Sequence, residues 1–88
     1  MLQKTLTVQN KLGIHARAAA KLVDTAKKFG SKIELIFRGR SIDCKSIMGV
    51  ITLGAQKDNE LEIIITGEDE AEALAAIEKL FNGKFGEE

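Results

Sequence analysis

The spacing of hydrophobic residues changes repeatedly along this chain, between strict alternation and a helical period of about 3.6 residues. In residues 2–8 apolar side chains alternate with Gln and Thr, apart from Lys4 on the apolar side, and this predicts a strand. Residues 10–13 are typical of a loop. In residues 16–29 the apolar positions recur at helical spacing, which predicts a helix that Gly30 is placed to end.

Three further strands are predicted by the same alternation. Residues 33–37 form one of them, and residues 42–44 form another after a tight hairpin at Arg38–Gly39. Residues 61–66, which are rich in Ile, predict the fourth strand after a turn at Asp58–Asn59.

Two more helices are marked by the residues that precede them. Ser46 stands before the apolar run 47–53 and predicts a short helix with a serine N-cap. Asp69, with Glu72 three positions later, forms a capping-box pattern that predicts the start of the last helix. Along that helix the pattern predicts a core stripe made of Leu74, Ile77, Leu80 and Phe81.

The element order β-α-β-β-α-β-α predicts an α+β fold, a two-layer sandwich with helices on one face of a mostly antiparallel sheet. The other sheet face should be solvated, and its predicted residues are Thr5, Thr7, Glu34 and Glu62. The 88 residues are expected to form a single domain, residues 1–88. A chain this short leaves no room for a deep cavity, so any chemistry should take place at the surface.

Composition excludes several classes of protein. The 13 basic and 13 acidic residues cancel without forming a basic block, which argues against a nucleic-acid binder. The single Cys44 cannot form an internal disulfide. No apolar run approaches 18 residues, and the first residues do not resemble a signal peptide. We therefore expect a cytoplasmic protein that does not insert into membranes.

His15 is the only histidine and lies where the predicted loop becomes a helix. Imidazole is a neutral side-chain nucleophile near pH 7, and the backbone N–H groups of a helix N-terminus favour a bound phosphate. Arg17 adds a planar cation suited to phosphoryl oxygens, and Gly13 allows close approach of the loop. From spacing alone, a second interpretation stays open, in which His15 only caps the helix. A metal site is disfavoured because there is no second histidine.

Two motifs resemble those of a known family. The segment Asn10–Arg17 is similar to the active-site motif of the HPr family of phosphocarriers, which includes a nitrogen-branch paralogue. The segment Lys45–Gly54 is similar to that family's segment around a regulatory serine, and Gly67–Ala71 also resembles the family. With the element order and the length, the resemblance covers essentially the whole chain. It implies the HPr-like fold of four antiparallel strands with three helices on one face.

The resemblance implies a carrier of the bacterial phosphoenolpyruvate:sugar phosphotransferase system and not a turnover enzyme. Enzyme I would phosphorylate His15 on Nδ1, and the phosphoryl group would pass to an enzyme II A domain of a sugar permease. Arg17 would stabilise the phosphoryl group together with the backbone amides of Ala16 and Arg17. No metal or other cofactor is implied, and a monomer is expected.

The resemblance also implies a regulatory site and a docking surface. Ser46 would be a target of HPr kinase/phosphorylase, whereas the simpler alternative is an ordinary N-cap. Because a short helix cannot bury every apolar residue, some should be exposed beside His15. The implied docking residues for enzyme I and enzyme II A domains are Ala20, Ile47, Met48 and Ile51. Val50 and Leu53 are expected in the core.

One residue departs from the family pattern, and other functions stay open. The family usually has Pro after the arginine, where this chain has Ala18. Because Ala is a good helix former, the helix should still form. We expect the substitution to affect the rate of phosphoryl transfer more than the function itself. The alternatives are a nitrogen-branch carrier, a regulator of the same fold that is never phosphorylated on His15, and an α/β ligand- or RNA-binding module. The last would need aromatic residues on the open sheet face, and the chain has only four Phe.

Overall fold

The computed structural model describes residues 1–87. Its elements are β1 (Leu2–Thr7), α1 (Ala16–Ala26), β2 (Lys32–Phe37), β3 (Arg40–Asp43), α2 (Ile47–Thr52), β4 (Glu60–Thr66), α3 (Glu70–Asn82) and the 3₁₀ turn η1 (Lys84–Gly86). The strands form one antiparallel sheet in the order β1-β4-β2-β3. The predicted α+β fold and element order are confirmed. No helix within residues 1–87 is long and apolar enough to cross a membrane.

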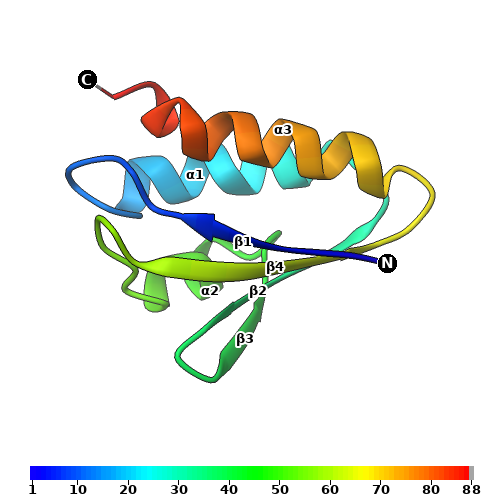
Figure 1. Ribbon diagram of the computed structural model, residues 1–88, viewed down its shortest axis with the longest axis horizontal. Helices are drawn as coiled ribbons and strands as arrows, with labels where there is room; N and C mark the ends of the chain where they lie inside the picture. The colour runs from blue at the N-terminus through cyan, green and yellow to red at the C-terminus, as the bar shows by residue number, and fades with distance from the viewer. Residues whose placement is uncertain (88) are drawn as a thin grey trace.

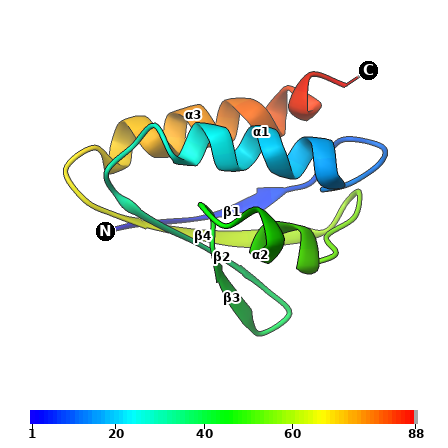
Figure 2. The same cartoon turned by 180° about the vertical axis from the view of Figure 1, so that it is seen from behind.

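The helices α1 and α3 lie side by side over one face of the sheet (Figure 1). The shorter α2 contacts α1 and β3, below the N-terminal half of α1 (Figure 2). This arrangement brings the N-terminus of α1 and the end of α3 to the same end of the molecule (Figure 1).

The core lies between the helix pair and the sheet. Alternate residues of the two central strands face it, with Leu35 opposite Ile63 and Ile33 opposite Ile65 in the β2–β4 register. Each of these four side chains is at most 1% exposed, as strict alternation in an antiparallel sheet requires. Cys44 lies just after β3 and is fully buried, and this burial raises the pKa of its thiol to about 12. It is therefore an unreactive core residue.

The first helix is shorter than its hydrophobic pattern predicts. It ends at Ala26 instead of Phe29, and residues 27–29 form a tighter turn. In that turn the backbone N–H groups of Lys28 and Phe29 bond to the carbonyls three residues earlier. Such i→i−3 bonds are common in the last turn of a helix. Phe29 nevertheless packs against the core, which explains why it continued the periodic pattern.

The capping box predicted for the last helix does not form. The carboxylate of Asp69 makes no hydrogen bond to its own helix, and Glu72 is exposed. The carboxylate of Glu70 instead accepts the backbone N–H of Gly67 at 3.1 Å. In the core stripe, Ile77 and Phe81 are buried as predicted, whereas Ala73 also enters the core and Leu74 and Leu80 are only partly buried.

Candidate functional site

The loop after β1 is fixed by a close approach to the loop before β4. Gly13 has φ +71°, and a Cβ on it would lie 2.7 Å from the carbonyl oxygen of Ala55. The next residue, Ile14, donates its backbone N–H to the same oxygen at 3.0 Å. Gly13 is therefore required for both its backbone angle and its lack of a side chain, in agreement with the close approach expected from the sequence.

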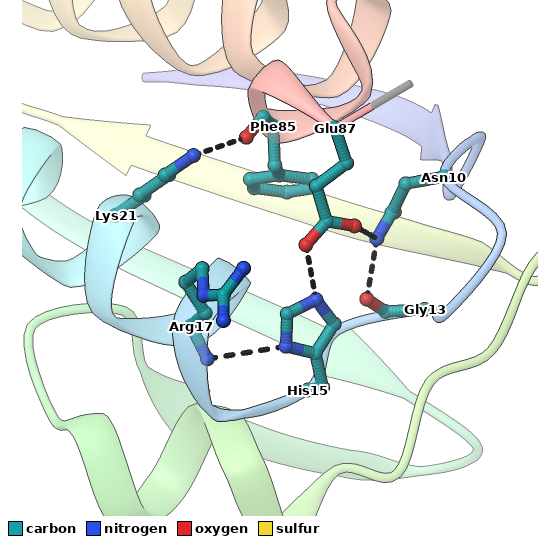
Figure 3. A network of polar contacts seen from close by, with 7 residues as sticks. All are labelled: Asn10, Gly13, His15, Arg17, Lys21, Phe85 and Glu87. Carbon is teal, nitrogen blue, oxygen red and sulfur yellow. Dashed lines mark hydrogen bonds and ion pairs between the residues drawn. The ribbon is translucent and has the colours of Figure 1, made fainter.

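His15 is the N-cap of α1, with extended backbone angles of φ −78° and ψ −179°. Its Nδ1 accepts the backbone N–H of Arg17 at 3.2 Å (Figure 3). Because a nitrogen that accepts a hydrogen bond carries no proton, Nδ1 presents its lone pair at the helix N-terminus. The side chain is 27% exposed, so the ring is held in place yet reachable from solvent.

A residue that sequence reasoning missed completes this site from the other side. The Glu87 carboxylate binds Nε2 of His15 through one oxygen and the side-chain amide of Asn10, at 3.0 Å, through the other (Figure 3). Asn10 is fully buried and also donates to the carbonyl of Gly13 at 2.6 Å. The Asn10 hydrogen bond, followed by the contact with His15, holds the pKa of Glu87 below its usual range.

The segment after α3 carries Glu87 to the site. Phe85 is 1% exposed, and its ring centroid lies 5.0 Å from that of Phe81. Lys21 of α1 donates from its ammonium group to the carbonyl of Phe85 at 2.6 Å (Figure 3). Three successive residues, at positions 84–86, have positive φ, so the chain turns sharply toward His15. The only hint of this in the sequence is an aromatic residue beyond the predicted last helix.

Arg17 lies in the first turn of α1 with an exposed side chain. Within residues 1–87 its guanidinium forms no hydrogen bond or ion pair. With Lys11 and Lys21, among others, it lines an open hollow of about 470 Å³ that Glu87 also borders. Ala16 is the first helical residue, so its backbone N–H has no acceptor within the helix. The surroundings of Nδ1 therefore favour an anion.

Comparison with known proteins agrees with this geometry. The family described as "PTS HPr component phosphorylation site" matches residues 2–83. This chain belongs to the HPr family of phosphocarrier proteins. It is 49% identical to phosphocarrier protein HPr of Xylella fastidiosa (strain Temecula1 / ATCC 700964), over 100% of this chain and 99% of that protein. It is 48% identical to phosphocarrier protein HPr of Treponema pallidum (strain Nichols), over all of both chains.

A solved structure extends the agreement to the whole fold. The crystal structure of HPr-C-His from Thermoanaerobacter tengcongensis matches with a TM-score of 0.96 at 42% identity, over 100% of this chain and 99% of that one. The HPr-like fold expected from the motifs is thus confirmed. As an HPr-family member the protein is a phosphoryl carrier of the phosphotransferase system and not an enzyme. The family implies enzyme I and enzyme II A domains as its partners.

The second HPr motif forms α2 and its cap. Ser46 is exposed, and its hydroxyl accepts the backbone N–H of Gly49 at 3.1 Å, which confirms the predicted N-cap. Ile47 is 42% exposed and Met48 is 63% exposed.

The remaining apolar residues of this region divide between surface and core. Ile51 of α2 is half-buried, and so is Ala20 of the neighbouring α1. Val50 and Leu53 are buried, as expected. Leu12 is 71% exposed in the loop that leads to His15. Within residues 1–87, no group of three or more His, Cys, Asp or Glu side chains is placed to hold a metal ion.

Proposed function

We propose that His15 is the residue of this HPr-family protein that accepts the phosphoryl group from phospho-enzyme I and passes it to an enzyme II A domain. The observation that carries this assignment is the unprotonated Nδ1 of the sole histidine, held at the N-terminus of α1 by the N–H of Arg17. A helix N-terminus favours the negative charge that arrives with a phosphoryl group.

The chemistry requires little beyond positioning and charge. The Nδ1 lone pair attacks phosphorus, the bond between phosphorus and the donor atom breaks, and its electron pair stays with the donor. The Arg17 N–H, which donates to Nδ1 before the reaction, becomes available to a phosphoryl oxygen afterwards. The backbone N–H of Ala16 and the Arg17 guanidinium supply further donors for these oxygens.

The test of this assignment is labelling by phosphoenolpyruvate and enzyme I. We expect His15→Ala to lose all acid-labile phosphate, because it lacks the nucleophile, while its circular dichroism matches that of the parent. Arg17→Ala should still be labelled, at least tenfold more slowly, because one cation that binds the transferred group is gone. Acid-labile phosphate on the His15→Ala variant would overturn the assignment.

Ser46 is proposed as a site of regulatory phosphorylation by an HPr kinase/phosphorylase. This is supported by its exposed position at the N-terminus of α2, where a phosphate would be tolerated, and by the family motif around it. The exposed side chains of Ile47 and Met48 support a docking surface for enzyme I and enzyme II A domains. The half-buried Ala20 and Ile51 complete this surface. NMR mapping of the backbone amide chemical shifts during titration with unlabelled enzyme I tests this surface. Shift changes confined to the opposite face of the sheet would contradict the proposed surface.

We assign the protein to the sugar branch, as a monomer in the cytoplasm. The Ser46 segment supports the sugar branch, because that motif resembles the regulated members of the family. The nitrogen branch is the alternative, and phosphorylation by each type of enzyme I in parallel separates the two. Sedimentation equilibrium at the concentrations used for transfer measures the oligomeric state, and a dimer would contradict the monomer assignment.

A further inference from the structure

Both ring nitrogens of His15 are engaged, from opposite sides of the imidazole (Figure 3). A neutral imidazole carries one N–H proton, on either Nδ1 or Nε2, and the other nitrogen is an acceptor. The Arg17 backbone N–H can only donate, so Nδ1 must accept and the proton must lie on Nε2. The partner of Nε2 is the Glu87 carboxylate, which when ionised can only accept. The two contacts therefore specify the same tautomer.

We propose that Glu87 is a positioning residue for phosphoryl transfer, which holds His15 in the Nε2–H tautomer and stabilises the positive charge that the ring acquires as Nδ1 bonds to phosphorus. This inference rests on the proposed role of His15 as acceptor. A carboxylate that orients an imidazole and stabilises the imidazolium formed during reaction is a recurrent arrangement in nucleophilic catalysis.

The charges of the step show why a carboxylate helps. The Nδ1–P bond forms, the bond from phosphorus to the donor breaks with its electron pair kept by the donor, and no proton is transferred. The ring keeps its Nε2–H and becomes cationic, next to the negative carboxylate of Glu87.

The backbone conformation just before Glu87 indicates that the fold enforces the contact between Glu87 and His15. Lys84 and Phe85 both have φ +55°, a left-handed conformation that is strained for residues other than glycine. Such strain persists only where the surroundings enforce it, and it gathers at functional positions. Here the burial of Phe85 and the hydrogen bond from Lys21 enforce it. Asn10 then fixes the second carboxylate oxygen of Glu87, whose side chain is 15% exposed.

The first measurement is the tautomer of His15 in the unphosphorylated protein, from the two ring ¹⁵N chemical shifts at about pH 8.5, where an ordinary imidazole is neutral. We expect the Nε2–H form alone in the parent and a mixture of both tautomers in Glu87→Ala. Glu87→Gln keeps an acceptor oxygen but loses the charge, so it should retain mostly the Nε2–H form. The matched control is Glu68→Gln, which replaces an exposed carboxylate in the loop before α3. Its His15 should show the same tautomer as in the parent.

The second measurement is the rate of phosphorylation by enzyme I in the same four proteins. Glu87→Ala should be about tenfold slower than the parent, and Glu87→Gln should lie between them because it restores orientation without charge. If Glu87→Ala keeps either the parental tautomer or the parental rate, the inference is overturned. The acceptor assignment is tested separately, since it fails only if His15→Ala is still labelled, and the tautomer shifts do not depend on that result.

Discussion

Asp69 binds Ser31 twice, through the backbone N–H at 3.0 Å and through the hydroxyl, and so joins the start of α3 to the segment that leads into β2. The other carboxylate oxygen accepts the backbone N–H of Gly30 at 2.9 Å. These bonds satisfy the backbone donors of the turn that follows α1. The carboxylate that resembles a helix cap in the sequence is therefore a link between two segments 38 residues apart.

This link predicts a pH-dependent contribution to stability. The Ser31 hydroxyl, followed by the Gly30 N–H, lowers the pKa of Asp69 from its ordinary value of 3.8. A carboxyl group whose pKa is depressed by folding stabilises the native state above its unfolded pKa, and this stabilisation is lost as the pH falls through the folded value. We expect Asp69→Asn to have a lower urea midpoint than the parent at about pH 7, with the difference shrinking between about pH 5 and pH 2.

The matched control for Asp69 is Asp24→Asn. Asp24 is exposed on α1, and its carboxylate forms no hydrogen bond or ion pair with another residue in 1–87. Its urea midpoint should follow that of the parent across the same pH range. A constant difference between Asp69→Asn and the parent at all pH values would show that the charge of Asp69 is not what stabilises the turn.

Gly13 predicts a second effect on stability. In Gly13→Ala the new Cβ would lie 2.7 Å from the Ala55 carbonyl oxygen and 2.9 Å from Cα of Gln56, both backbone atoms that cannot move independently. Together with the unfavourable φ, this should lower the free energy of unfolding by roughly 2–4 kcal/mol. Gly39→Ala is the control, because its φ is +78° but nothing lies within 4 Å of its Cβ. It should lose only about 1 kcal/mol.

Urea unfolding of the two variants measures this difference. Gly13→Ala should also slow phosphorylation of His15, since the loop that ends at His15 must shift away from the loop before β4. Equal unfolding free energies for the two glycine variants would mean that the loop before β4 moves aside at little cost.

Substitutions at Ser46 should change the stability and the rate of phosphoryl transfer independently of each other. Asp caps helices about as well as Ser, so Ser46→Asp should unfold near the parental urea midpoint. Its new charge lies at the start of the helix that presents Ile47 and Met48, where an approaching partner would have to desolvate it. We expect phosphorylation by enzyme I to be about tenfold slower, equivalent to about 1.4 kcal/mol.

Ser46→Ala is the complementary variant. It removes the hydrogen bond from Gly49 and should lose about 1 kcal/mol of stability, with the transfer rate nearly unchanged. Stopped-flow phosphorylation and urea midpoints of both variants separate capping from charge. If Ser46→Asp is phosphorylated as fast as the parent, Ser46 acts only as a cap.

Interactions between residues close in the chain were predictable from the sequence alone. Alternation places Ile33 and Leu35 on the buried face because successive side chains of a strand point to opposite sides. The Ser46 cap depends on a backbone donor three residues away, so its motif contains both partners. The position of His15 before α1 is local in the same sense, and its family motif is continuous in the chain.

Only the tertiary structure decided the partners of Asp69 and of His15. A capping motif predicts that Asp69 turns toward its own helix, yet the free donors of Gly30 and Ser31 lie within reach once α1 and α3 pack together. Glu87 lies 72 residues from His15, and no periodicity or motif connects them. Their contact depends on a left-handed turn that the burial of Phe85 stabilises, and burial is a property of the packed chain that no short segment of sequence carries.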